Sequence, residues 1–282
     1  MRSLTLPARF CRSLGDEAMR QERMMNTMGN TILITGGGSG IGRGLAEAFH
    51  RLGNTVIIAG RGSKRLDETT SANPGMKALQ VDMTSPESIR SLAAQAAAKF
   101  PDLNVVIHCA GVMMPEDLVK EKNFQSDNVT ISTNLLGPMR LTEELLPTLL
   151  KQPHATIMTV TSGLAFIPMA LTPTYCATKA AIHSYTQSLR YQLRDTQVQV
   201  IELAPPYVAT GLMGEAQAND PNAMPLGEFI SETMGILKNQ PAATEVLVKR
   251  VLPLRFAESE GQEKYRQFFQ QFNDRVSKQH LG

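Results

Sequence analysis

With 282 residues, of which 42% are hydrophobic, the chain is long and apolar enough for one large α/β domain or two small ones, and it is not a disordered chain. Its formal net charge of +2 gives no reason to expect nucleic acid or an anionic membrane as a partner, and no apolar run approaches the roughly 18 residues of a membrane-spanning helix. The three cysteines lack metal-ligand spacing and an even count for disulfides, so we expect no metal site and a reducing compartment.

The segment before the first predicted strand, residues 1–28, is rich in arginine, and its acidic residues come late. An arginine-rich, acid-poor start is typical of a mitochondrial transit peptide, whereas a disordered arm or an upstream start codon are the simpler alternatives. Because Met24, Met25 and Met28 lie close to the first strand, we favour a dispensable extension on a cytoplasmic protein. We expect a chain that starts at Met28 to fold and remain active.

From residue 31 the sequence alternates between strand and helix patterns. Helices are predicted at 40–52, from Lys64 with Ser63 as cap, at 86–100 after the cap Ser85, at 127–150 and at 173–193. Strands are predicted at Ile32–Ile34, Thr55–Ala59, Lys77–Asp82, Asn104–Cys109, Thr156–Thr161 and Val198–Leu203. This alternation requires parallel strands with crossover helices on both faces, which is a doubly wound, Rossmann-type, three-layer α/β/α fold.

The pattern changes after the sixth strand. Residues 205–226 are rich in glycine, proline and asparagine and suit a mobile substrate lid, and helices are predicted at 227–238 and 242–251. A last helix carries an aromatic stripe at helical spacing, which we interpret as a core or oligomer face, formed by Tyr265, Phe268, Phe269 and Phe272. We expect one domain over 29–282, with C-terminal helices over about 227–276.

The stretch Thr35–Gly42 holds too many glycines for a regular element, and it lies between the first strand and the first helix. Glycines let a backbone approach phosphates closely, and the free amides at a helix start attract negative charge. The stretch therefore predicts a binding site for a dinucleotide pyrophosphate, with a flexible glycine loop as the alternative.

Three polar side chains in the second half suit acid–base chemistry. Tyr175 and Lys179 are four residues apart on a predicted helix, where an ammonium would lower the tyrosine pKa and make the hydroxyl a usable acid or base. Ser162 lies at the carboxyl edge of the sheet, where its hydroxyl can reach a substrate carbonyl. Taken alone, the pair also fits an ordinary amphipathic helix, and the serine also fits a turn or helix cap.

Together these pieces resemble the classical short-chain dehydrogenase/reductase family over about residues 29–230, and 29–60 with the Pro-Pro turn resembles its Dlt-operon oxidoreductase branch. Thr35-Gly-x-x-x-Gly40-x-Gly42 matches the family's cofactor motif, and Cys109-Ala-Gly stands where the family has Asn-Ala-Gly. The resemblance implies a catalytic tetrad of Asn134, Ser162, Tyr175 and Lys179. It also implies cofactor contacts from Gly36, Ser39, Ile41, Gly42, Asp82, Met83, Cys109, Tyr175, Lys179, Val208 and Thr210.

Cofactor choice is indicated by the residues that follow the second strand. NAD sites use a carboxylate there for the ribose hydroxyls, whereas this chain has Ala59-Gly-Arg61. A guanidinium suits the 2′-phosphate of NADP, helped by Ser63 and Lys64, so we predict NADP(H) and include Arg61 among the cofactor-binding residues. The alternative is that Arg61 is a solvated loop residue.

The resemblance implies that Tyr175 donates a proton to a carbonyl oxygen, Ser162 polarises that oxygen, Lys179 tunes Tyr175 and binds the ribose, and Asn134 holds a water. The chain departs from the family pattern at Cys109 and at Pro206. Pro206 stiffens the base of the lid. The apolar loop 163–173, together with Leu212, Met213, Met224 and Leu226 in the lid, indicates a small apolar or amphipathic substrate, with secondary metabolism as one setting. The resemblance also implies a homo-dimer or homo-tetramer.

Two other functions remain open. A dinucleotide-sensing regulator would use the same fold without catalysis, but the complete tetrad argues against it. A sugar-nucleotide epimerase or dehydratase also uses Tyr-x-x-x-Lys, but those enzymes have a different glycine spacing and a larger C-terminal substrate domain.

Overall fold

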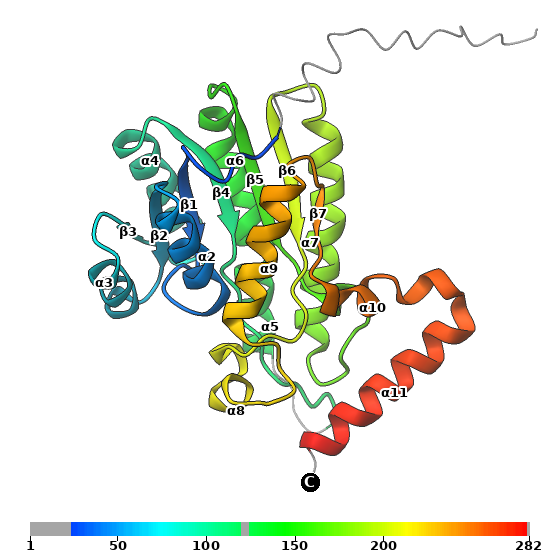
Figure 1. Cartoon of the computed structure of the whole chain (residues 1–282). Helices are drawn as coiled ribbons and strands as arrows, with labels where there is room; N and C mark the ends of the chain where they lie inside the picture. Colours follow the sequence, from blue (N-terminus) through cyan, green and yellow to red (C-terminus); the bar gives the residue numbers. More distant parts are fainter. Residues whose placement is uncertain (1–23, 120–123, 281–282) are drawn as a thin grey trace, which may run out of the picture.

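The computed structural model describes residues 24–119 and 124–280 and shows one parallel sheet between two layers of helices (Figure 1). The strand order is β3-β2-β1-β4-β5-β6-β7, and every neighbouring pair is parallel. The doubly wound Rossmann-type fold is therefore confirmed. The strands are β1 (Thr31–Thr35), β2 (Thr55–Gly60), β3 (Lys77–Gln80), β4 (Leu103–His108), β5 (Ala155–Val160), β6 (Val198–Leu203) and β7 (Glu245–Val246).

The central strands are buried because helices cover both faces of the sheet. Ile32 and Ile34 of β1 belong to a core formed with the helices on one face, and Leu33 belongs to the core on the other face. The first face is covered by α2 (Gly40–Arg51), α3 (Ser63–Ala72) and α9 (Leu226–Asn239), and the second by α4 (Pro86–Lys99), α6 (Gly137–Leu149) and α7 (Pro173–Gln192). Among the described helices, none combines the length and the apolar character needed to cross a bilayer.

The helix predicted at 242–251 is wrong. Its place is taken by the short strand β7, a 3₁₀ turn at Lys249–Val251 and α10 (Leu252–Arg255). Val246 and Val248 are fully buried, an alternation with a period of two that indicates extended backbone. β7 forms because it extends the sheet beside β6, which is a contact that local pattern does not show.

The helix predicted at 127–150 begins earlier and is not regular. It consists of α5 (Phe124–Ile131), a π-helical turn at Ser132–Leu136 that contains Asn134, and α6. A Cβ on Gly137 would lie 2.8 Å from the carbonyl oxygen of Met83, so only glycine lets α6 approach this close. π-Helical turns inside helices often occur at functional sites.

The two predicted helix caps have different outcomes. The Ser85 hydroxyl accepts the amide of Ser88 at 3.1 Å and caps α4, as predicted. Ser63 is instead the first residue of α3, and Gly62 takes the cap position without a side-chain hydrogen bond.

The start of the domain lies further upstream than predicted. Met25 is only 3% exposed, and its amide donates to the carbonyl of Pro241 at 3.3 Å. The carbonyl of Thr27 accepts from Asn54 Nδ2 at 2.9 Å. Residues 24–28 of the predicted extension therefore pack on the domain, and residues 1–23 lie outside the described residues.

The C-terminal helix α11 (Gln262–His280) runs along the edge of the molecule, away from the sheet (Figure 1). Its Phe272 and Val276 pack against a small cluster that includes Met169 and Tyr175. The Asn273 side chain accepts the amide of Ala170 at 2.6 Å. Part of the predicted aromatic stripe thus packs beside Tyr175.

Candidate active site

A cleft of about 860 Å³ lies at the carboxyl ends of the strands, where open α/β sheets bind ligands. Four segments line it. They are the glycine turn after β1, residues 109–114 after β4, Val160–Ser162 at the end of β5, and the segment from Pro205 to Leu212 after β6. Tyr175 and Lys179 line it from α7.

The glycine turn is required by close backbone contacts. Gly36 has a φ of +71°, and a Cβ there would lie 2.9 Å from the Cα of Ala110. A Cβ on Gly42 would overlap the carbonyl oxygen of Gly36. Gly36, Ser39, Ile41 and Gly42 all line the cleft, so the first turn of α2 faces it with its free amides.

The Thr35 hydroxyl has a structural role that sequence reasoning missed. It accepts the amides of Cys109 and Ala110, each at 3.1 Å, and so connects the ends of β1 and β4. This connection does not depend on the side chain at position 109. Cys109 lines the cleft, and burial raises the pKa of its thiol to about 11.

Ser162, Tyr175 and Lys179 meet beside this turn. Ser162 is 8% exposed and its Oγ accepts the amide of Leu164 at 3.1 Å. The Lys179 ammonium donates to the carbonyl of Val160 at 2.8 Å and lies 5.5 Å from the centre of the Tyr175 ring. The Ser162 hydroxyl is close enough to that of Tyr175 to lower the pKa of the tyrosine.

The electrostatics of this group differ from the expected effect of Lys179 on Tyr175. Burial raises the pKa of the Tyr175 hydroxyl well above its ordinary value, and the nearby Ser162 hydroxyl offsets only part of this rise. Burial also lowers the pKa of Lys179 to about 8, which the nearby Cys109 thiol partly opposes. Desolvation therefore outweighs the lowering predicted from the sequence, and Tyr175 is protonated at neutral pH.

Asn134 contacts the backbone of the segment that follows β4. Its Oδ1 accepts the amide of Val112 at 2.9 Å, and its Nδ2 donates to the carbonyl of Val112 at 2.8 Å and to Thr178 Oγ1 at 3.2 Å. It is 2% exposed and does not line the cleft. Its side chain thus fixes one wall of the cleft.

At the far end of the cleft, Arg61 lines the opening together with Arg43, Arg65 and Glu68. Sequence reasoning missed the other two arginines, because their helical positions carry no motif. Two predicted contacts, Asp82 and Met83, do not line the cleft. Asp82 lies beyond the end of β3 and accepts the amide of Thr84 at 2.9 Å, a bond that lowers the pKa of its carboxyl.

The predicted lid is held at both ends by backbone hydrogen bonds. The amide of Ala209 donates to Met224 at 2.9 Å, and the amide of Met224 donates to Tyr207 at 2.8 Å. Val208 and Thr210 line the cleft, as does Leu212. Met224 is instead buried in the core with Leu226 packed against it, so these two side chains do not face a substrate.

Most of the apolar side chains that line the cleft come from segments other than the predicted lid. Met113, Met114 and Val129 line the cleft, and Met113 packs in one cluster with Tyr175. Sequence reasoning missed them because they follow a strand or lie on a helix with no distinguishing motif.

A parallel sheet with a glycine turn after its first strand, facing a serine, a tyrosine and a lysine across one cleft, defines a dinucleotide-binding oxidoreductase. The family model described as short chain dehydrogenase matches residues 30–221. The chain belongs to the short-chain dehydrogenase family and is an oxidoreductase acting on CH–OH or C=O groups.

Similar proteins include the uncharacterized oxidoreductase DltE of Bacillus subtilis (strain 168), which is 42% identical over 189 residues, covering 67% of this chain and 75% of DltE. Estradiol 17-beta-dehydrogenase 11 of Homo sapiens is 28% identical over 250 residues, covering 83% of each protein. The likeness to DltE agrees with the branch suggested by the sequence.

Solved structures share the fold at lower identity. A short-chain dehydrogenase from Sphingobium yanoikuyae in complex with NADPH has a TM-score of 0.71 and 23% identity, covering 82% of this chain and 92% of that one. A short-chain dehydrogenase/reductase from Burkholderia phymatum in complex with NAD has a TM-score of 0.72 and 20% identity, covering 84% and 95%. Proteins of this fold therefore bind either cofactor.

Proposed function

We propose that this protein reduces the carbonyl of a small apolar or amphipathic compound with NADPH, or oxidises the matching alcohol. The observation that carries the proposal is the meeting of Ser162, Tyr175 and Lys179 in the cleft that the glycine turn lines. The nicotinamide cofactor, when bound, supplies or accepts the hydride. Orientation and proton transfer fall to the protein's own side chains.

In the reducing direction, the Tyr175 hydroxyl gives its proton to the carbonyl oxygen, and Ser162 donates a hydrogen bond to the same oxygen. The raised pKa of Tyr175 keeps this proton in place at neutral pH. The phenolate left on Tyr175 lies beside the Lys179 ammonium, which stabilises it. With a pKa of about 8, Lys179 can then lose a proton near neutral pH, so it suits the return of a proton to Tyr175.

The choice of NADP(H) is supported by charge at the far end of the cleft. Arg43, Arg61 and Arg65 line it together with the carboxylate of Glu68. Arg43 already pairs with Glu47 at 2.7 Å, so Arg61 and Arg65 carry this argument. Guanidinium groups bind phosphates with paired hydrogen bonds, which suits a 2′-phosphate. The apolar wall of Met113, Met114, Val129 and Leu212 supports an apolar substrate.

The test compares variants with para-nitrobenzaldehyde and phenanthrenequinone as carbonyl probes, following NADPH absorbance. Tyr175→Phe should keep the fold and cofactor affinity while kcat falls by about 10²–10⁴-fold. Lys179→Met should lower both kcat and NADPH affinity, because it removes a charge beside the reacting hydroxyl and a ribose contact.

The matched control is Tyr185→Phe, on the same helix, because Tyr185 packs against the core and does not line the cleft. It should leave kcat unchanged. A Tyr175→Phe protein that reduces the probes at nearly the original rate would overturn the proposed mechanism and favour a dinucleotide-sensing role.

A further inference from the structure

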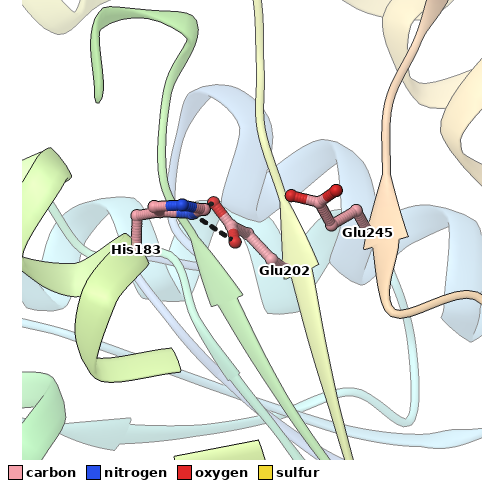
Figure 2. A group of neighbouring side chains, drawn as sticks. All are labelled: His183, Glu202 and Glu245. Carbon is pink, nitrogen blue, oxygen red and sulfur yellow. Dashed lines mark hydrogen bonds and ion pairs between the residues drawn. The ribbon is translucent and has the colours of Figure 1, made fainter. Parts of the chain in front are cut away.

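A carboxylate is buried on β6, next to the edge strand β7, close to the catalytic group. Glu202 lies on β6 and is fully buried. Its oxygens accept from Thr161 Oγ1 at 2.7 Å and lie 2.8 and 2.9 Å from His183 Nδ1 on α7. Figure 2 shows His183 and Glu202 joined in this way, with the Glu245 carboxylate on the neighbouring strand facing them.

Glu202 and the residues that follow it are hydrogen-bonded to both sequence neighbours of Ser162. Thr161 directly precedes Ser162, and its amide donates to the carbonyl of Leu203 at 2.9 Å. The amide of Gly163 donates to the carbonyl of Pro205 at 2.8 Å. The backbone on both sides of Ser162 is therefore bonded to the end of β6, and the Thr161 side chain is bonded to Glu202.

The segment β7–α10 completes this cluster. Glu245 lies opposite Glu202 in the register of β6 and β7. Arg255 donates to the Glu245 carboxylate at 3.0 and 3.2 Å. A Cβ on Gly163 would lie 2.5 Å from Leu254 Cδ1, so α10 packs directly on the turn that follows Ser162. The two residues that flank Ser162 therefore both contact this cluster, Thr161 through Glu202 and Gly163 through α10.

Ligand atoms of His183, Glu202 and Glu245 lie within 4.8 Å of one another, a grouping compatible with a cation. The partners favour a different interpretation. Arg255 already neutralises Glu245, and Gln187 Nε2 lies 2.7 Å from His183 Nε2. We therefore interpret the cluster as an ion-pair and hydrogen-bond network.

We propose that Glu202, held by His183, is a positioning residue that sets the place of Ser162 through Thr161. This inference rests on the proposed function, because it assumes that Ser162 bonds the reacting oxygen. A buried ion pair is weak evidence for a stabilising role, because replacing such a pair with apolar residues often leaves the free energy of unfolding unchanged or raises it. Its value here is the fixed direction of one hydroxyl next to the catalytic turn.

The test removes the connection and leaves both ends in place. Thr161→Val keeps the side-chain shape and loses only the hydroxyl, which bonds Glu202 at 2.7 Å and makes a longer contact of 3.4 Å with the carbonyl of Leu203. The matched control is Thr159→Val, two residues earlier on β5, which loses an equally buried bond of 2.8 Å to Thr186 on α7. Thr161→Ser should restore the unmodified behaviour.

Two readouts separate positioning from general loss of structure. With para-nitrobenzaldehyde, Thr161→Val should lower kcat about 10- to 100-fold while KM and NADPH affinity change little, since small misplacements have effects of this size. By amide hydrogen exchange, the Leu164 amide, which donates to Ser162 Oγ, should exchange several-fold faster. Thr159→Val should change neither value.

Equal effects of Thr161→Val and Thr159→Val on kcat and on Leu164 exchange would overturn the inference. Ser162→Ala, measured in parallel, distinguishes this failure from failure of the proposed function. If Ser162→Ala lowers kcat and Thr161→Val does not, only the positioning role is wrong. If Ser162→Ala keeps the full rate, the proposed function itself is wrong. The exchange measurement needs no turnover, so it decides the positioning role for any substrate.

Discussion

The two halves of the sheet contribute to the cleft in opposite ways. In the turn after β1, two positions lack side chains, so that Gly36 and Gly42 allow backbone to approach backbone. At the ends of β5 and β6, the chain buries polar side chains, and Ser162, Lys179 and Glu202 are all under 9% exposed. Both arrangements fix geometry at the same edge of the sheet.

The difference shows which kind of change each half tolerates. The glycine half depends on free space beside the backbone, so any side chain added at its glycines should weaken cofactor binding. The polar groups of its glycine turn are mostly backbone amides. The polar half depends on hydrogen bonds and charge, so isosteric changes that remove one polar group should matter there. The predictions below test this contrast, beginning with the largest expected effect.

Gly36→Ala should weaken NADPH binding by about 100-fold or more and lower the free energy of unfolding, because its Cβ would overlap Ala110. The control is Gly53→Ala. Gly53 has a φ of +82° but nothing within 4 Å of a Cβ, so it should lose only the about 1–2 kcal/mol of left-handed strain. Fluorescence titration and denaturant unfolding measure both. If the two variants bind NADPH equally well, space is not what the glycine half provides.

In the polar half, burial of Lys179 predicts a pH-dependent stability. Its pKa is about 8 in the folded protein and about 10.4 when unfolded. Between these values the unfolded chain binds more protons, so stability should rise with pH, by up to about 3 kcal/mol from this group. Lys179→Met should lack this rise between about pH 8 and 10.5, whereas Lys99→Met, at an exposed position, should keep it. Parallel curves for all three proteins would show that Lys179 is not desolvated.

Residues 24–28 connect the two halves, because Met25 packs in the core and bonds Pro241 before β7. A chain that starts at Met24 should be as stable as the full chain, whereas one that starts at Met28 should lose about 2 kcal/mol, the value of burying one such side chain. Denaturant unfolding of the three proteins measures this. Equal midpoints for the two shortened chains would restore the boundary that the sequence alone predicts.

The smallest effect concerns Arg61, one of the arginines of the glycine half to which we assign cofactor choice. Arg61→Asp should weaken NADPH about tenfold and relatively favour NADH, because it replaces a phosphate partner with a partner for ribose hydroxyls. Lys64→Asp makes the same change of charge nearby. The sequence suggested that Lys64 helps Arg61, but Lys64 does not line the cleft, so its effect should be under about twofold. Tighter NADH than NADPH binding by the unmodified protein would refute the NADP(H) assignment.

The sequence by itself determined six of the seven strands, their parallel arrangement and the glycine turn. Each of these depends on residues that are close together in the chain, such as the apolar run from Ile32 to Ile34 or the spacing of Tyr175 and Lys179 on one helix. Local periodicity and backbone geometry are enough to predict such features. The class of fold then placed Ser162 and the glycine turn at the same edge of the sheet.

Only the tertiary structure decided which distant residues meet. β7 exists because it pairs with β6. Met25 is buried because it packs in the core and bonds Pro241. The Glu202 carboxylate has hydrogen-bond partners because His183 and Thr161 face it. The charge of Glu202 inside an apolar strand was visible in the sequence, but its partners were not. Burial likewise reversed the expected direction of the Tyr175 pKa, since desolvation depends on everything packed around a group and not on its sequence neighbours.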